Sequence, residues 1–170
     1  MTRPQPTCLS SCAAGRTALV GLLLTAGCGP GAADQSAVVE APPPIAVTLT
    51  LSPTLQGSRL RIAGTTDLPD GAVIVYEVRH ERWATEGELQ WFREGQVVVE
   101  EGAFSTRTRL RSWPRGALQV WASFQTVLPD GQQPPEVIAT FGEMGERLAG
   151  DNVTQVGDMK RAEVTARVER

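Results

Sequence analysis

Side chains that could perform nucleophilic, acid–base or metal chemistry are scarce in this chain. Its 170 residues include three cysteines, Cys8, Cys12 and Cys28, and one histidine, His80. A Ser-His-acid triad would need His80 as its base, but no strand-turn-helix segment presents a serine, and we expect His80 on the surface at a strand end. Sites built from histidine and thiolate are excluded by count. We therefore predict that the chain is not an enzyme and holds no metal or cofactor.

Carboxylates are the remaining candidates for catalysis. A pair of acids can hydrolyse glycosides, and the candidates are Glu77, Glu81, Glu100 and Glu101. Nothing in the sequence fixes the distance between any two of them. A carboxylate-dependent hydrolase is therefore the least favoured of three functional hypotheses.

The first 27 residues have the parts of a secretory signal peptide. A polar start with Arg3 and Arg16 and no acid precedes an apolar run from Thr17 to Ala26. This run is about half the roughly 20 residues needed to cross a bilayer, so we expect it to target the chain and not to anchor it. The following segment, Leu24 to Cys28 (LTAGC), resembles the bacterial lipobox, with Thr25 where leucine is most common.

The lipobox resemblance implies that signal peptidase II cuts between Gly27 and Cys28 and that Cys28 carries the lipid, including palmitate. Residues 1–27 are then a cleaved signal peptide, and the lipid makes the membrane a partner. Gly29 follows where aspartate would mark retention, which in bacteria with two membranes implies the outer membrane. An ordinary secretory signal, in which Cys28 is incidental, is the alternative.

Residues 28–44 are expected to form a flexible tether. The segment is rich in glycine, alanine and proline and too poor in large apolar side chains to offset its ordering entropy. At an extended rise it would reach roughly 50 Å. After cleavage Cys28 is the only cysteine left, so no internal disulfide can form. The net charge of −3 becomes more negative without Arg3 and Arg16, so nucleic acid is not an expected partner.

Residues 45–170 alternate period-two patterns with turn signals, which predicts one all-β domain. About eight strands are expected, at Ala46 to Leu51, Arg59 to Ala63, Val73 to His80, Leu89 to Phe92 leading into Val97 to Val99, Phe104 to Leu110, Leu118 to Thr126, Val137 to Phe141, and Ala162 to Val168. Only Gly142 to Ala149 could hold a helical turn.

Two Leu-Pro-Asp-Gly turns, at 68–71 and 128–131, separate strands, with proline preset for the second turn position and glycine free to take positive φ. Short strands without crossover helices favour an antiparallel two-sheet sandwich of about 7–8 strands. A small closed barrel is the alternative.

Three segments resemble a layout shared by a group of uncharacterised bacterial lipoproteins and membrane-anchored proteins. They are Gly64 to Gly71 (GTTDLPDG), Glu101 to Phe104 (EGAF) and Phe141 to Gly150 (FGEMGERLAG). The match covers about residues 45–150, with Asp67 where asparagine is common. The resemblance implies an immunoglobulin-like strand count and no particular activity.

Surface aromatic residues are the first candidates for ligand contact. Trp121 shares the polar face of its strand with Gln119 and Ser123, so alternation places it outward, where it can stack on a sugar or a partner's apolar side chain. Trp83 and Trp91 are further candidates. The alternative is that a loop spanning residues 83–95 folds over Trp121.

Outward arginines are the second candidates, namely Arg59, Arg61, Arg107, Arg109 and Arg111. If their strands share a sheet, they form a basic stripe that could meet anionic lipid headgroups, lipopolysaccharide or an acidic polymer. The alternative is that cross-strand glutamates neutralise them. Glu163 and Glu169, beside Arg167 on the last strand, are the suitable acids.

The sequence thus favours a lipid-tethered, non-catalytic interaction or structural module of the bacterial envelope; its partner is not identified by the sequence, and an envelope protein or a glycan are the candidates. A carbohydrate or cell-wall binding module that uses the surface tryptophans is the second hypothesis. The oligomeric state is left open.

Overall fold

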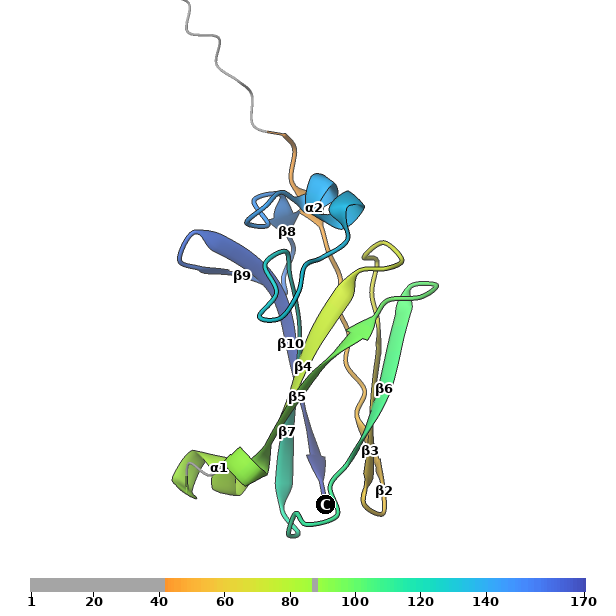
Figure 1. The fold of residues 1–170 in the computed structure, drawn as a ribbon, viewed down its shortest axis with the longest axis vertical. Coiled ribbons are helices and arrows are strands. Elements are labelled where there is room, and N and C mark those ends of the chain that lie inside the picture. The colour runs from red at the N-terminus through yellow and green to blue at the C-terminus, as the bar shows by residue number, and fades with distance from the viewer. Residues whose placement is uncertain (1–41, 87–88) are drawn as a thin grey trace, which may run out of the picture. The chain divides into compact units, whose positions relative to one another are not determined.

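The computed structural model describes residues 42–86 and 89–170 (Figure 1), and these belong to one compact unit. The predicted signal peptide, the cleavage site at Gly27 and Cys28, and the tether before Pro42 lie outside the described residues. None of the helices in the described ranges is long and apolar enough to cross a membrane.

The larger sheet has five antiparallel strands in the order β5-β4-β7-β10-β9. Its strands are β4 (Val73–His80), β5 (Phe92–Val98), β7 (Ala117–Gln125), β9 (Val153–Val156) and β10 (Met159–Glu169). β7 lies at its centre, paired with β4 on one side and β10 on the other. Trp121 of β7 is therefore flanked by strands on both sides.

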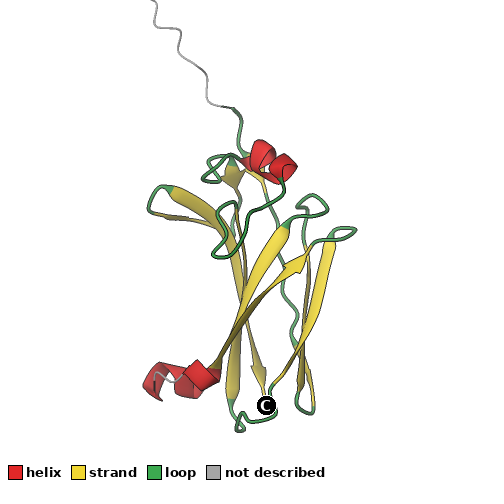
Figure 2. Ribbon diagram, in the orientation of Figure 1, coloured by secondary structure: helices red, strands yellow, loops and turns green. Residues whose placement is uncertain are grey.

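A second antiparallel sheet has the order β2-β3-β6, formed by β2 (Thr54–Gln56), β3 (Arg59–Thr65) and β6 (Ala103–Arg109). A third, small sheet pairs β1 (Ile45–Ala46) in parallel with β8 (Leu148–Ala149). Three short helical segments complete the unit: α1 (Glu81–Glu86), η1 (Leu89–Trp91) and α2 (Pro135–Phe141). Figure 2 shows α2 at the end of the unit where β8 lies and α1 near the other end.

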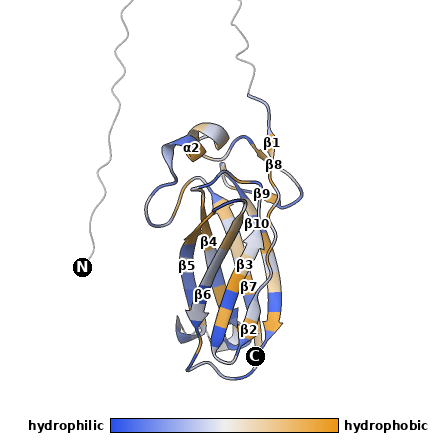
Figure 3. Ribbon diagram, turned by 90° about the vertical axis from the view of Figure 1, so that its right-hand side faces the viewer, coloured by the Kyte–Doolittle hydropathy of each residue, from blue (hydrophilic) through white to orange (hydrophobic). Residues whose placement is uncertain are grey.

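Side chains from the two larger sheets pack together in two core clusters. Leu60 and Ile62 of β3 pack in the same cluster as Val78 of β4 and Val120 of β7, and all four are fully buried. Hydrophilic and hydrophobic residues alternate along β3 (Figure 3), so its apolar side chains face this core and its arginines face out. The fold is all-β and sandwich-like, and its sheets are open, so the closed-barrel alternative is wrong.

The strand predicted at Val137 to Phe141 is wrong, because these residues belong to helix α2. Pro135 occupies the first turn, where its fixed φ suits a helix and its missing N–H costs nothing. Val137 and Phe141 lie four residues apart and are both buried, which is helical spacing. The predicted helical turn at 142–149 is also misplaced, because the helix ends at Phe141, with Gly142 as its C-cap, and β8 follows at Leu148–Ala149.

The strand predicted at Ala46 to Leu51 is mostly irregular, since only Ile45–Ala46 is a regular strand and Leu49 makes an isolated bridge to Thr66. Backbone N–H groups in this segment bond successively to β8, to a side chain and to β3. Their acceptors are the Ala149 carbonyl, the Asp67 carboxylate and the Thr65 carbonyl. Bonds shared among different partners cannot build a continuous ladder.

Glycine takes positive φ in both predicted Leu-Pro-Asp-Gly turns, but the bond that closes the first runs from the Ala72 N–H to the Pro69 carbonyl at 3.1 Å, so Pro69 is the first turn residue and not the predicted second. Gly71 and Gly131 have φ of 87° and 88°, the positive region that glycine enters without steric cost. The first of these turns leads directly into β4 and so places Arg79 and His80 further along that strand.

Candidate functional site

A groove of about 410 Å³ opens on the outer face of the five-stranded sheet, beside Trp121. Trp121 points away from the core, as alternation along β7 predicts, and it is half-buried. The strand register places Glu77 and Thr165 on either side of it. Trp83 of α1 also lines the groove, so two of the predicted contact residues come together there.

Arg79 lies between the two tryptophans of the groove. Its guanidinium carbon is 4.3 Å from the ring centroid of Trp83 and 4.5 Å from that of Trp121. Each such contact at a partly exposed site stabilises by about 0.5–1 kcal/mol. The side chain of Glu77 forms an ion pair with Arg79 at 2.5 Å. Arg79 of the same sheet thus lies over Trp121, and Trp83, from the segment expected to fold over Trp121, lies over the same guanidinium.

Trp91, the third predicted aromatic contact, is only 8% exposed. Its ring lies 5.7 Å from that of His80 and 6.4 Å from that of Trp113, between ring centroids. These three side chains form an aromatic cluster in the core at the α1 end of the unit. Trp91 therefore offers little surface to a ligand, unlike Trp83 and Trp121.

The prediction of a surface histidine is wrong, since His80 is 1% exposed. Helix α1 begins at the next residue, and the Arg82 backbone N–H donates to His80 Nδ1 at 3.1 Å. His80 Nε2 is buried without a hydrogen-bond partner. The following α1 and η1 segments turn the chain back over this strand end, and period-two alternation does not report such a turn.

Four arginines form what we call the arginine face on the outside of the three-stranded sheet: Arg59, Arg61, Arg107 and Arg109. Their strands do share a sheet, and the register sets Arg59 directly opposite Arg109 and Arg61 directly opposite Arg107. All four are exposed. The fifth predicted member, Arg111, lies beyond the end of β6 and so outside the sheet.

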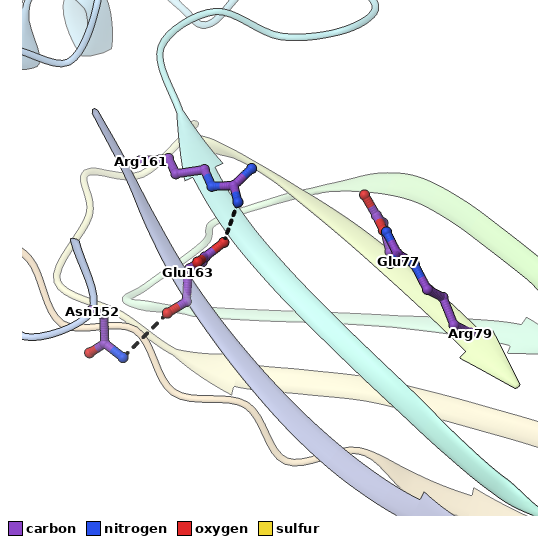
Figure 4. A network of polar contacts seen from close by, with 5 residues as sticks. All are labelled: Glu77, Arg79, Asn152, Arg161 and Glu163. Atoms are coloured by element: carbon purple, nitrogen blue, oxygen red, sulfur yellow. Dashed lines mark hydrogen bonds and ion pairs between the residues drawn. The ribbon is translucent and has the colours of Figure 1, made fainter. Parts of the chain in front are cut away.

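The glutamates expected to neutralise this face are engaged elsewhere. Glu163 pairs with Arg161 at 2.8 Å (Figure 4), and Glu169 pairs with Arg167 at 3.0 Å. Both pairs lie within β10, in the other large sheet. Within residues 42–86 and 89–170, the ion pairs recorded do not include any arginine of the arginine face.

The candidate catalytic carboxylates are dispersed. Glu77 is paired with Arg79 on the outer face of β4, whereas Glu100 and Glu101 lie exposed at the turn between β5 and β6. Glu81 begins α1. The part of the chain that the structure describes contains no group of three or more histidine, cysteine, aspartate or glutamate side chains arranged to hold a metal ion.

The Gly64–Gly71 motif supports the entry of the chain into the domain. The Thr66 hydroxyl donates to the Thr48 carbonyl at 2.7 Å, and the Asp67 carboxylate accepts the Thr48 N–H at 2.8 Å. Gly64 lies so close to the Thr50 carbonyl that a Cβ there would overlap its oxygen. These residue types are therefore needed to hold the segment from Thr48 to Thr50 against β3.

The Phe141–Gly150 motif holds the same entering segment from the other side. A Cβ on Gly150 would lie 2.7 Å from the Val47 carbonyl oxygen. Arg147 donates from Nη1 to the Thr140 carbonyl at 2.8 Å, and from Nε to the Pro43 carbonyl at 3.1 Å. This motif thus joins the end of α2 to the start of the described chain.

Both motifs therefore have structural roles that account for their residue types. Neither of them contributes a lining residue to the groove beside Trp121. Comparison of the chain with protein-family models, with curated proteins and with solved structures gave no match.

Proposed function

We propose that this chain is a lipoprotein of the bacterial envelope, held at a membrane through lipid on Cys28, and that residues 45–170 act as a non-catalytic interaction module. The support from sequence is the lipobox-like segment ending at Cys28 and the proline-rich stretch behind it. On this proposal the domain presents a binding surface at a distance from the membrane that the tether sets. The outer membrane is the proposed location where the cell has two.

The observation that carries this proposal is that the start of the described residues, at Pro43 and Ile45, is held at one end of the domain. Arg147 binds the Pro43 carbonyl, and the Ile45 N–H donates to the Arg147 carbonyl at 2.6 Å. The chain therefore enters at the end where β8 and α2 lie (Figure 1). The outer faces of both large sheets are flanks of the unit, so a tether at this end leaves them available to a partner.

Labelling in cells tests the anchor. We expect the full chain to incorporate palmitate and to accumulate as precursor when globomycin blocks signal peptidase II. Cys28→Ser should lose both properties and become soluble. Cys12→Ser is the matched control, because it removes a thiol from the segment predicted to be discarded, and it should label normally. Palmitate retained by Cys28→Ser would refute the anchor.

We further propose that the two large sheets form one immunoglobulin-like sandwich. The shared cluster of Leu60, Ile62, Val78 and Val120 supports this, because sandwiches bury the facing sides of two sheets against each other. The chain also passes from β5 in one sheet to β6 in the other through the turn at Glu101 and Gly102. Such crossings between sheets are typical of sandwich topologies.

A glycan-binding module is the second candidate, favoured by the groove beside Trp121. Its volume of about 410 Å³ lies within the range of small-molecule sites, and sugars stack on exposed indole faces. Arg79 occupies one face of both Trp83 and Trp121, so a sugar must use the other face or displace the arginine.

Tryptophan fluorescence tests this second candidate. Binding of an envelope glycan should quench the emission of the full chain, and Trp121→Ala should abolish the quenching. Trp113→Phe serves as control, because Trp113 is 3% exposed and is not among the residues that line the groove. Emission that stays unchanged across a panel of cell-wall glycans would exclude a glycan at this groove.

A further inference from the structure

The arginine face combines like charges in an arrangement that costs stability. Two arginine pairs stand directly across neighbouring strands, Arg59 with Arg109 and Arg61 with Arg107. Like charges in directly opposed positions destabilise a sheet, whereas opposite charges there stabilise it by about 0.2–1 kcal/mol. A glutamate at either position of each pair would remove the repulsion. The sheet instead keeps four guanidinium groups together on its outer side.

The neighbouring side chains are neutral hydrogen-bonding groups. The register of β2 against β3 sets Thr54 opposite Arg61 and Gln56 opposite Arg59. On β6, Ser105 accepts a hydrogen bond from Arg61 Nε at 3.1 Å. Hydroxyl and amide donors beside guanidinium groups are the chemistry that binds an oxyanion.

The arginine face also contains a hollow of about 260 Å³, lined by Thr54, Gln56, Arg59, Arg61 and Arg107. This is slightly below the range of sites that enclose a drug-sized molecule. It suits a single anionic group with its nearest substituents. Guanidinium groups bind phosphate oxygens in a bidentate manner and lose less hydration than ammonium groups.

We propose that the arginine face binds a polymer that carries phosphate groups at intervals. Arg59 and Arg61 are two residues apart on β3, so the two cross-strand pairs are separated by about 7 Å. One phosphate would occupy the hollow lined by Arg59, Arg61 and Arg107, and the next along the polymer would reach Arg109. The phosphate polymer is a partner that the proposed lipoprotein function leaves open. The inference rests on that function only for the location of the domain in the envelope.

The arginine face extends toward the end of the unit opposite the start of the described residues. The described chain starts at the end where β8 and α2 lie, whereas β3 begins at the opposite end, beside the C-terminus (Figure 1). Arg59 and Arg109 form the pair nearest that far end, because β3 starts at Arg59 and β6 ends at Arg109.

Binding to inorganic polyphosphate tests the proposal, with the full chain carrying Cys28→Ser so that lipid plays no part. The chain should bind at 50 mM salt and lose about tenfold or more in affinity at 200 mM, because phosphate contacts release counterions. Arg61→Gln with Arg107→Gln should weaken binding at least tenfold. Thermal unfolding of this variant should not fall below that of the parent, because both side chains are exposed and their removal relieves the repulsion between them.

Arg161→Gln with Arg167→Gln is the matched control, since it removes the same charge from the other large sheet and should change affinity less than twofold. Equal weakening by the control pair would overturn the proposal, as would the absence of binding at 50 mM salt. Stronger binding to vesicles of phosphatidylglycerol and phosphatidylethanolamine than to polyphosphate would assign the face to a membrane and refute the polymer. Palmitate labelling is read separately, so failure of either experiment leaves the other intact.

Discussion

Gln133 closes the ladder between β4 and β7, and its replacement should be among the more costly single changes in the domain. The regular pairing of these strands begins at Ile74 opposite Phe124. One residue further out, the Gln133 amide takes over. Its oxygen accepts the Val73 N–H at 2.8 Å, and its nitrogen donates to the carbonyls of Val73 at 2.7 Å and Gln125 at 2.9 Å.

Gln133→Met isolates these three bonds, because methionine keeps the length of the side chain but forms none of them. Gln133 is 2% exposed, so water cannot readily replace the lost partner. A buried bond contributes about 1 kcal/mol net, and a group left unsatisfied costs about 1–3 kcal/mol. We expect a loss of about 2–4 kcal/mol, and hence a fall of roughly 1–2 M in the urea midpoint.

Urea unfolding followed by circular dichroism measures this loss, and hydrogen exchange at the Val73 amide reports it locally. Gln132→Met is the matched control, because Gln132 is the exposed neighbour in the same loop and should stay within about 0.5 kcal/mol of the parent. If the free energy of unfolding of Gln133→Met lies less than about 1 kcal/mol below that of the parent, the three bonds do not hold the strands together and the reasoning fails.

Three further substitutions test the packing and the charge of the domain. Gly64→Ala should lower stability by about 1–3 kcal/mol, because the new methyl group overlaps the Thr50 carbonyl; an unchanged melting temperature would show that β3 can move away freely. Phe124→Ala should cost about 3–5 kcal/mol, since the ring is fully buried and packs edge-on against Phe141 at 5.3 Å, and a smaller loss by urea titration would mean that the core collapses around the cavity. Arg107→Glu should raise stability by about 0.2–1 kcal/mol at low salt by facing Arg61 with an acid. That gain should vanish in 1 M salt, and its persistence would show that it is not electrostatic.

Strands that alternate cleanly were predictable from sequence, because one face of each is buried. In β7 the residues Leu118, Val120, Ala122 and Phe124 are all buried. A shift of one residue would expose all of them, so the pattern fixes both the strand and the outward direction of Trp121. The same reasoning gave the outward direction of the arginines on β3 and β6.

Short elements were not predictable in this way. Helix α2 spans only Pro135–Phe141, less than two full turns, and its two buried residues fit a strand almost as well as a helix. β2 and β9 are edge strands with mostly exposed residues, so burial imposes little pattern on them. The proline pair at 134–135 was the one available signal for the helix, since proline is favoured in a first helical turn.

The candidate sites depended on strand pairing that no local pattern contains. Alternation shows that Arg61 and Arg107 point outward, but only the register shows that they are directly opposed. Likewise, the contact of Arg79 with Trp121 joins β4 to β7. His80 was misjudged for a related reason, because its burial results from the aromatic cluster with Trp91 and Trp113, which lie further along the chain.

The motif residues and the outer faces of this domain should respond oppositely to mutation. The side chains of Thr66 and Asp67 are committed to backbone groups of the entering segment, so changes there should lower the free energy of unfolding without altering the affinity of the folded domain. The exposed Arg61 and Arg107 support no core contact and repel each other, so their loss should weaken binding of the proposed partner without lowering the free energy of unfolding. The residues of the two motifs therefore carry information about the architecture of this domain. Its partner must be sought from the residues on the outer faces, which the motifs do not supply.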